Sequence, residues 1–213
     1  MARPAGHQWE PLGLDQDPVP GDTEVISGEA RHLMTVAQQL EGQVSALHRI
    51  TDNSENVGKT PDMVRSAAAD LSGSLAMAAA RYHKVATALS NWVPELAQAQ
   101  SWSIRALNEA EVPYAKIKNT PAPSGLNLVT GIDGLPQLDP PSSSNWLTPV
   151  QLQDYTDYRN AISRAQDELA AARALLNRAM VLRDNKGSYY ANQISNACND
   201  ELEARGGRGS RTG

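Results

Sequence analysis

The chain has no phenylalanine, and tryptophan and tyrosine bring its aromatic content to only 5% of 213 residues. Alanine and leucine supply most of its apolar side chains. The apolar content, 40%, lies below the roughly 45–50% of an average globular domain. Such a composition serves a bulky core or an apolar cofactor cage poorly, whereas it suits helices that pack closely along shared seams. It therefore favours packed helices and predicts no bound cofactor.

Cysteine and long apolar runs are also scarce. Cys198 is the single cysteine, which excludes an internal disulfide and leaves helix packing or an intermolecular disulfide as its role. No window approaches the roughly 18 apolar residues of a membrane span, so we expect no membrane insertion. Residues 1–13 lack the apolar core of a signal peptide, and we therefore expect synthesis in the cytoplasm without a cleaved signal.

The charge pattern disfavours nucleic acid as a partner. The net charge is −5 and both signs are interspersed, whereas phosphate binding needs a basic face. The one basic stretch is residues 205–213, where arginines alternate with Gly and Ser. Its composition predicts a disordered tail, with an RNA-contacting Arg/Gly tail as the alternative.

Motifs that carry catalysis or metal binding are missing or incomplete. No two histidines have metal-ligand spacing, and Glu29 and His32 form only half of the paired Glu-x-x-His motif of a di-iron bundle. The segment 58–60 lacks the first glycine of a P-loop, and there is no Gly-x-Ser-x-Gly elbow. We therefore predict a protein that is not an enzyme and that has no metal site.

The first half of the chain predicts an arm followed by a helical hairpin. Residues 1–22 are rich in proline and glycine and are interpreted as an extended arm. Residues 23–50 carry one apolar stripe with spacings of three and four, and Asp22 or Thr23 can cap this helix. A turn follows over 51–59, and its centre is Asn56, Val57 and Gly58.

The second predicted helix begins at Thr60–Pro61, continues to residue 118 and has a seven-residue apolar repeat. Such a repeat predicts left-handed coiling against a partner helix, and Pro94 predicts a bend near residues 90–91 with Trp92 at the corner. One row of the repeat consists of Val64, Leu71, Ala78, Val85, Trp92, Ala99 and Ala106. The other row consists of Ala68, Leu75, Tyr82, Leu89, Leu96, Ser103 and Ala110.

The second half of the chain predicts a loop and further helices of the same bundle. Residues 119–148 are rich in Pro, Gly and Ser, and predict an irregular loop whose apolar part can dock on the helices. The segment 149–204 predicts a long helix that stops at Asn185 and Gly187, followed by a short helix over 188–203.

These elements predict an all-α fold, an elongated antiparallel helical bundle with a long coiled-coil-like hairpin over 23–118. The apolar arm either packs back on its own bundle or straps onto a partner. The residues expected to form the packing or partner seam are Trp9, Leu12, Leu75, Tyr82, Leu89, Trp92 and Leu96.

Three stretches of this layout resemble a known family. They are the arm Trp9-Glu-Pro-Leu-Gly-Leu-Asp15 with Asp17-Pro-Val-Pro-Gly-Asp22, the mid-helix stretch Ala88-Leu-Ser-Asn-Trp-Val-Pro-Glu-Leu-Ala-Gln-Ala-Gln100, and, more loosely, Leu182-Arg-Asp184 with Ile194 and Ala197. The chain is similar to WxG-type (ESX-like) helical-hairpin proteins over about residues 9–200. It is most similar to the N-terminal module of type VII-secreted proteins and polymorphic toxins of high-GC Gram-positive bacteria.

The chain departs from that family at two points. Asn56-Val57-Gly58 stands where the family has Trp-x-Gly, and the Tyr-x-x-x-Asp/Glu export signal does not occur. The resemblance implies a targeting or partner-docking module of a type VII secretion substrate, exported by a type VII-like route and associated with a toxin domain. It would pair with small helical-hairpin proteins or with itself. The alternative is a structural scaffold protein of a phage-like or contractile particle.

Overall fold

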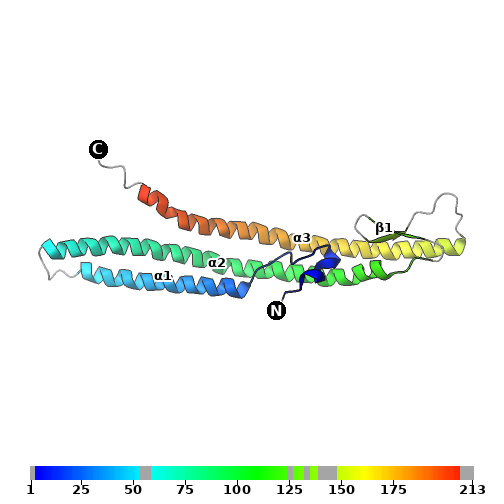
Figure 1. Cartoon of the computed structure of the whole chain (residues 1–213), viewed down its shortest axis with the longest axis horizontal. Coiled ribbons are helices and arrows are strands. Elements are labelled where there is room, and N and C mark those ends of the chain that lie inside the picture. The colour runs from blue at the N-terminus through cyan, green and yellow to red at the C-terminus, as the bar shows by residue number, and fades with distance from the viewer. Residues whose placement is uncertain (1–2, 53–58, 124–126, 132–134, 139–147, 207–213) are drawn as a thin grey trace. The chain divides into compact units, whose positions relative to one another are not determined.

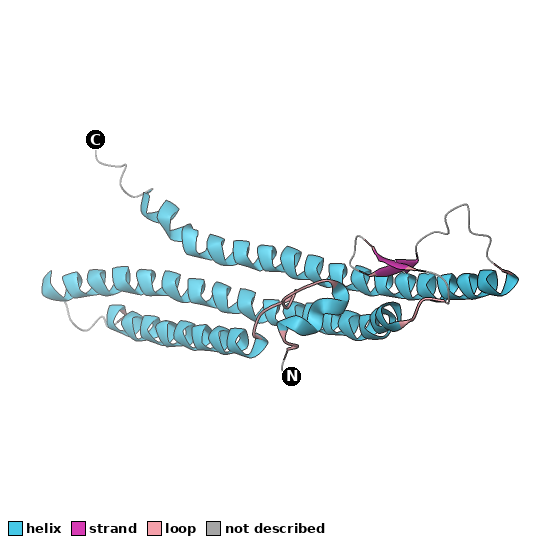
Figure 2. Ribbon diagram, turned by 45° about the vertical axis from the view of Figure 1, so that its right-hand side comes forward, coloured by secondary structure: helices cyan, strands magenta, loops and turns pink. Residues whose placement is uncertain are grey.

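The computed structural model describes residues 3–52, 59–123, 127–131, 135–138 and 148–206. Within these ranges the chain forms a short 3₁₀-helix, η1 (Gly6–Leu12), and the α-helices α1 (Thr23–Thr51), α2 (Lys59–Asn119) and α3 (Pro149–Gly206). Two short strands, β1 (Leu128–Thr130) and β2 (Pro136–Leu138), lie between α2 and α3 in the chain (Figures 1 and 2). The predicted all-α fold class is confirmed.

Helix α1 begins where its capping residue predicts. The Asp22 carboxylate accepts hydrogen bonds from the backbone N–H groups of Glu24 (2.9 Å) and Val25 (3.1 Å), which have no partner inside the helix. Glu24 lies in the first turn, and His48 and Arg49 lie in the last. The charges at both ends therefore complement the helix dipole.

The two long helices continue through residues that were expected to interrupt them. Helix α2 runs without a break across Pro94. Helix α3 continues through Asn185 and Gly187, so the predicted stop and the separate last helix are wrong. A glycine that ends a helix adopts a left-handed conformation. Gly187 does not, because positive φ occurs in the described residues only at Gly13 and Gly21.

The chain divides into two compact units. Unit 1 comprises residues 1–20 and 98–182, and unit 2 comprises residues 21–97 and 183–213. The boundary falls inside α2 and α3, so each of these helices supplies one part to each unit.

The core of unit 1 is built from small residues of two helices, from the arm and from the loop. Within this unit α2 and α3 run side by side and antiparallel (Figures 1 and 2). The buried cluster contains Trp9, Leu12, Ala106, Leu107, Ala110, Ile117, Leu135, Ala165, Leu169, Ala172 and Leu176. Because half of the helical members are alanines, the arm and Leu135 supply much of the bulk that closes this core.

The N-terminal arm is folded, which corrects the prediction of an extended segment. Residues 6–12 form η1, and Trp9 is completely buried while Leu12 is 6% exposed. Gly13 ends η1 with φ 79°, and its N–H donates to the Glu10 carbonyl at 2.8 Å. Tertiary packing of the indole therefore orders a segment whose composition alone indicates no regular structure.

Arg3 fastens the arm to α2. Its guanidinium pairs with the Asp17 carboxylate, and the Arg3 Nε–Asp17 Oδ2 distance is 2.7 Å. It also donates to the Gln100 carbonyl and to Ser103 Oγ, each at 3.1 Å. The guanidinium carbon lies 5.6 Å from the centre of the Trp9 ring. This partly buried cation therefore contacts the arm, α2 and the indole at once, and such charge-assisted bonds are stronger than neutral ones.

A second polar contact joins η1 to the end of α2. The Tyr114 hydroxyl donates to Glu10 Oε1 at 2.6 Å, and the Lys118 ammonium donates to the same oxygen at 3.2 Å. The Tyr114 hydroxyl, with Lys118 second, lowers the pKa of the Glu10 carboxyl below its usual value. Glu10 is exposed, so this contact orients η1 more than it stabilises the unit.

Part of the predicted loop forms two paired strands, and this segment contributes to the core of unit 1. Strands β1 and β2 are antiparallel, with Val129 opposite Gln137, and the Gly131 N–H donates to the Leu135 carbonyl at 2.8 Å. Leu135 is 5% exposed and belongs to the core. The sequence predicted that an apolar part of this segment can dock, but not that it forms strands.

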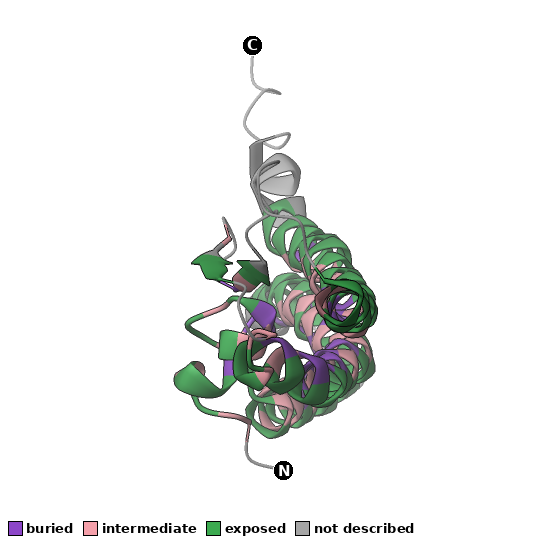
Figure 3. Ribbon diagram, turned by 90° about the vertical axis from the view of Figure 1, so that its right-hand side faces the viewer, coloured by how far each residue is buried: buried purple, intermediate pink, exposed green. Residues whose placement is uncertain are grey.

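In unit 2, α1 packs antiparallel on α2, and the seam differs from the predicted one. Ser72, Ala79 and Ala86 are almost fully buried, with exposures of 3%, 2% and 0%, whereas Val64 and Leu71 are each 52% exposed. The row of Ala68, Leu75, Leu89 and Leu96 is retained, but its companion row is shifted by one residue at this end of α2. Figure 3 shows that buried positions lie on the helix faces turned toward neighbouring helices.

The burial of the indole predicts a large loss of stability for Trp9→Ala. Truncating a fully buried aromatic should lower the free energy of unfolding by about 3–5 kcal/mol, measured by denaturant titration. His7→Ala, an exposed change in the same 3₁₀-helix, should stay within about 0.5 kcal/mol. Equal effects of the two substitutions would contradict the packing of the arm.

The shifted seam predicts unequal effects of two leucines on α2. Leu96 is 2% exposed, so Leu96→Ala should cost about 2–5 kcal/mol in thermal or chemical unfolding. Leu71→Ala should cost about 0.5 kcal/mol, because half of that side chain is already in water. If Leu71→Ala were the more destabilising of the two, the predicted row that contains Val64 and Leu71 would be the packed one.

Candidate functional site: a groove between α2 and α3

In unit 2, aromatic side chains join α2 to α3. The Trp92 and Tyr190 ring centres are 6.1 Å apart, and Tyr189 meets Tyr190 edge-on at 5.1 Å. Tyr189 is nevertheless 55% exposed. In a chain with few aromatics, three therefore gather at one point, and one of them still offers a ring to a partner.

An ion pair closes the same end of the interface. Lys186 donates from its ammonium group to Glu95 Oε1 at 2.8 Å, and the hydrogen bond to Glu95 raises the pKa of Lys186. Lys186 and Tyr190 lie one turn apart on α3, and their partners Glu95 and Trp92 lie about one turn apart on α2. The two helices are thus held together on this side of the groove.

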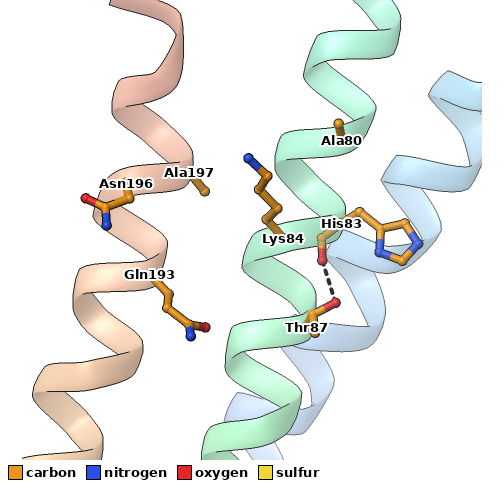
Figure 4. A pocket seen from close by; sticks show the side chains of 7 residues that line it. All are labelled: Ala80, His83, Lys84, Thr87, Gln193, Asn196 and Ala197. Carbon is orange, nitrogen blue, oxygen red and sulfur yellow. Dashed lines mark hydrogen bonds between the residues drawn. The ribbon is translucent and has the colours of Figure 1, made fainter.

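Beyond Trp92 a groove opens between the helices, with a volume of about 620 Å³. The lining residues are Ala80, His83, Lys84, Thr87, Gln193, Asn196 and Ala197. In Figure 4 the Lys84 and Gln193 side chains project into the gap, whereas the Asn196 amide turns away from α2. Small residues on both walls, Ala80 on α2 and Ala197 on α3, leave the space that these longer side chains enter.

The groove lining suits binding better than acid–base chemistry. Thr87 Oγ1 donates to the His83 carbonyl of its own helix at 2.8 Å, and the His83 ring points away from α3 (Figure 4). The remaining side chains are amides, alanines and one lysine. A groove lined by small residues lets another helix approach closely, and a few polar side chains can fix the position of that helix along the groove.

One pair elsewhere in unit 2 has the distance of a nucleophile and its base. Ser72 Oγ lies 2.7 Å from His48 Nε2. Ser72, however, is 3% exposed and lies within α2, where backbone N–H groups serve the helix and form no oxyanion hole. We therefore assign this pair to the packing of α1 on α2.

The structure distributes the predicted seam residues over two separate places. Trp9 and Leu12 lie in the core of unit 1. In unit 2, Leu96 is buried, Leu75, Leu89 and Trp92 are half-buried, and Tyr82 is 40% exposed. Asn56, Val57 and Gly58, predicted to form the inter-helix turn, lie outside the described residues.

Sequence reasoning missed the groove because its walls are alanines and polar residues, which give no periodic signal. A second seven-residue row, which includes Ser72, Ala79, Ala86, Val93 and Leu107, could have been found from spacing. This row does not stand out in a hydrophobicity pattern, because several of its side chains are small.

Among residues 3–52, 59–123, 127–131, 135–138 and 148–206, no three His, Cys, Asp or Glu side chains gather as metal ligands would. Glu29 and His32 of the half-motif are both exposed on α1. Over the same described residues, no helix combines the length and apolarity needed to cross a bilayer.

In comparisons with known proteins, no family model, curated protein or solved structure matches the chain.

Gly187 offers a test of the continuous α3 beside the groove. A methyl group there would lie 3.5 Å from Trp92 Cη2, an ordinary contact. Gly187→Ala should therefore raise the free energy of unfolding by about 0.5–1 kcal/mol, the usual gain of alanine over glycine inside a helix. Gly187→Leu, which would press on the indole, should lose that gain. A destabilising Gly187→Ala in thermal unfolding would indicate a helix end at this site.

Proposed function

We propose that the chain is a docking module without enzymatic activity that binds a partner helix in the α2–α3 groove of unit 2. The observation that carries this proposal is the groove itself, whose small-residue walls diverge beyond a fixed aromatic and ionic contact. The resemblance to WxG-type proteins supports a small helical hairpin as the partner and a type VII secretion substrate as the context.

The floor of the groove continues along one face of α2. Met77 precedes Ala80 by one turn, and Lys84 and Thr87 follow on the same face. Met77 is 48% exposed, so an apolar side chain extends the groove floor toward the start of α2. Methionine adapts its shape to a partner surface, which favours its use at such a position.

A second apolar row on α2 would receive the other helix of a hairpin. Val64, Leu71 and Tyr82 have exposures of 52%, 52% and 40%, and their spacing places them on one face of the helix. Exposed apolar side chains at helical spacing are the anchors that helix-in-groove recognition uses. A hairpin straddling α2 would thus cover both rows, and two helices reach the roughly 1,000 Å² that a specific interface needs.

The experiment is co-expression of the full chain with each small helical-hairpin protein encoded beside its gene, followed by size-exclusion chromatography with light scattering. We expect a 1:1 complex with one of them. Ala80→Arg should weaken the complex at least about tenfold by filling the groove, because Ala80 is exposed and the substitution leaves the core intact. Ala46→Arg, an exposed position on α1 outside both the groove and the exposed apolar row of α2, is the matched control.

Two results would contradict the proposal. If Ala46→Arg weakened the complex as much as Ala80→Arg, the effect would come from the added charge in general and not from the groove. If the chain bound no hairpin and instead formed rings or fibres of its own copies, the scaffold function would replace docking.

A further inference from the structure

A cavity of about 400 Å³ in unit 1 is separate from the groove and has a different chemistry. It lies between β2 and α3. Its described lining residues are Gln137, Tyr155, Tyr158, Arg159, Ile162, Ser163 and Gln166. Tyr158 and Ile162 are 7% and 6% exposed and form the floor, while the more exposed polar residues form the rim. The volume falls within the range of small-molecule sites, roughly 300–1,000 Å³.

The floor contains a buried hydroxyl without a partner. Tyr158 Oη is closed to solvent and has no hydrogen-bond partner among the described residues. Burial raises the pKa of this hydroxyl. Because its oxygen is closed to solvent, the ring of Tyr158 and not the hydroxyl faces the cavity. Nearly all buried polar groups are hydrogen-bonded, and an exception calls for an explanation. The Trp9 indole N–H likewise has no partner among the described residues, but Trp9 lies in the packed core and is not among the residues that line this cavity.

The rim carries one cation and no carboxylate in the part that the structure describes. The neighbours of Arg159 one turn away on α3 are Tyr155, Thr156, Ile162 and Ser163, and none of them is acidic. Its guanidinium therefore offers a fork of N–H donors at the cavity mouth, a geometry that matches a carboxylate. Ser163 and the Gln137 and Gln166 amides add further donors around it.

We propose that this cavity binds a carboxylate attached to a small apolar group, with Arg159 on the charged end and Tyr158 and Ile162 beneath the apolar part. The C-terminus of a short peptide and a free organic acid share this chemistry. The site is independent of the docking function proposed for unit 2, and either can fail without the other.

The experiment uses the full chain and three probes: the peptide acetyl-Ala-Ala-Leu with a free carboxylate, its C-terminal amide, and hexanoate. Binding is followed by two-dimensional NMR and calorimetry. We expect the free peptide acid or hexanoate to bind and the amide to bind at least about tenfold more weakly, because the charge-assisted pair is lost. Binding of the peptide acid alone would identify a peptide C-terminus as the source, and binding of both acids a small organic acid.

Two substitutions separate binding from folding. Arg159→Gln should weaken acid binding at least about tenfold, whereas Arg164→Gln, an exposed arginine of the same helix outside the cavity, should not. Tyr158→Phe should keep or raise the melting temperature of the free protein, because it removes a buried donor that has no partner among the described residues. It should leave acid binding unchanged, because the ring beneath the apolar part of the ligand is kept. Equal binding of acid and amide, full binding by Arg159→Gln, or no binding of either acid would overturn the proposal.

Discussion

The burial of Trp9 is the contact on which unit 1 depends. Two helices that meet through alanines approach closely but enclose little apolar surface, and they need a third wall to keep water from the seam. The indole supplies that wall and is among the largest completely buried side chains of the described residues. The Arg3–Asp17 pair, the hydrogen bonds to α2 and the Glu10 contact all hold this ring in place.

In unit 2, small side chains leave an open groove, whereas in unit 1 they belong to a closed core. There the facing alanines of α2 and α3 are not joined by a bulky third element, and a groove remains between them. Beside this groove, Trp92 meets Tyr190 and Glu95 meets Lys186. Small residues therefore pack where a large neighbour covers them and leave room where none does.

The sequence predicts those features that depend on local chemistry. Asp22 identifies the start of α1, and the apolar repeat identifies α2 as one long helix. It fails where tertiary contacts override local preference. Gly187 and Asn185 resemble a helix stop, yet the contacts of Lys186 and Tyr190 carry α3 onward. The fold of η1 was equally hidden, because it depends on a core assembled from distant segments.

The way in which the two units share the chain constrains their order of folding. In unit 2, His48 meets Ser72 across a short connection, so α1 and α2 can pair as soon as both have left the ribosome. In unit 1, the core around Trp9 cannot form until Leu169 and Leu176 have been synthesised, which happens much later. Throughout that interval the indole has no complete core, and the nascent chain carries an apolar N-terminal segment open to chaperones and to premature association.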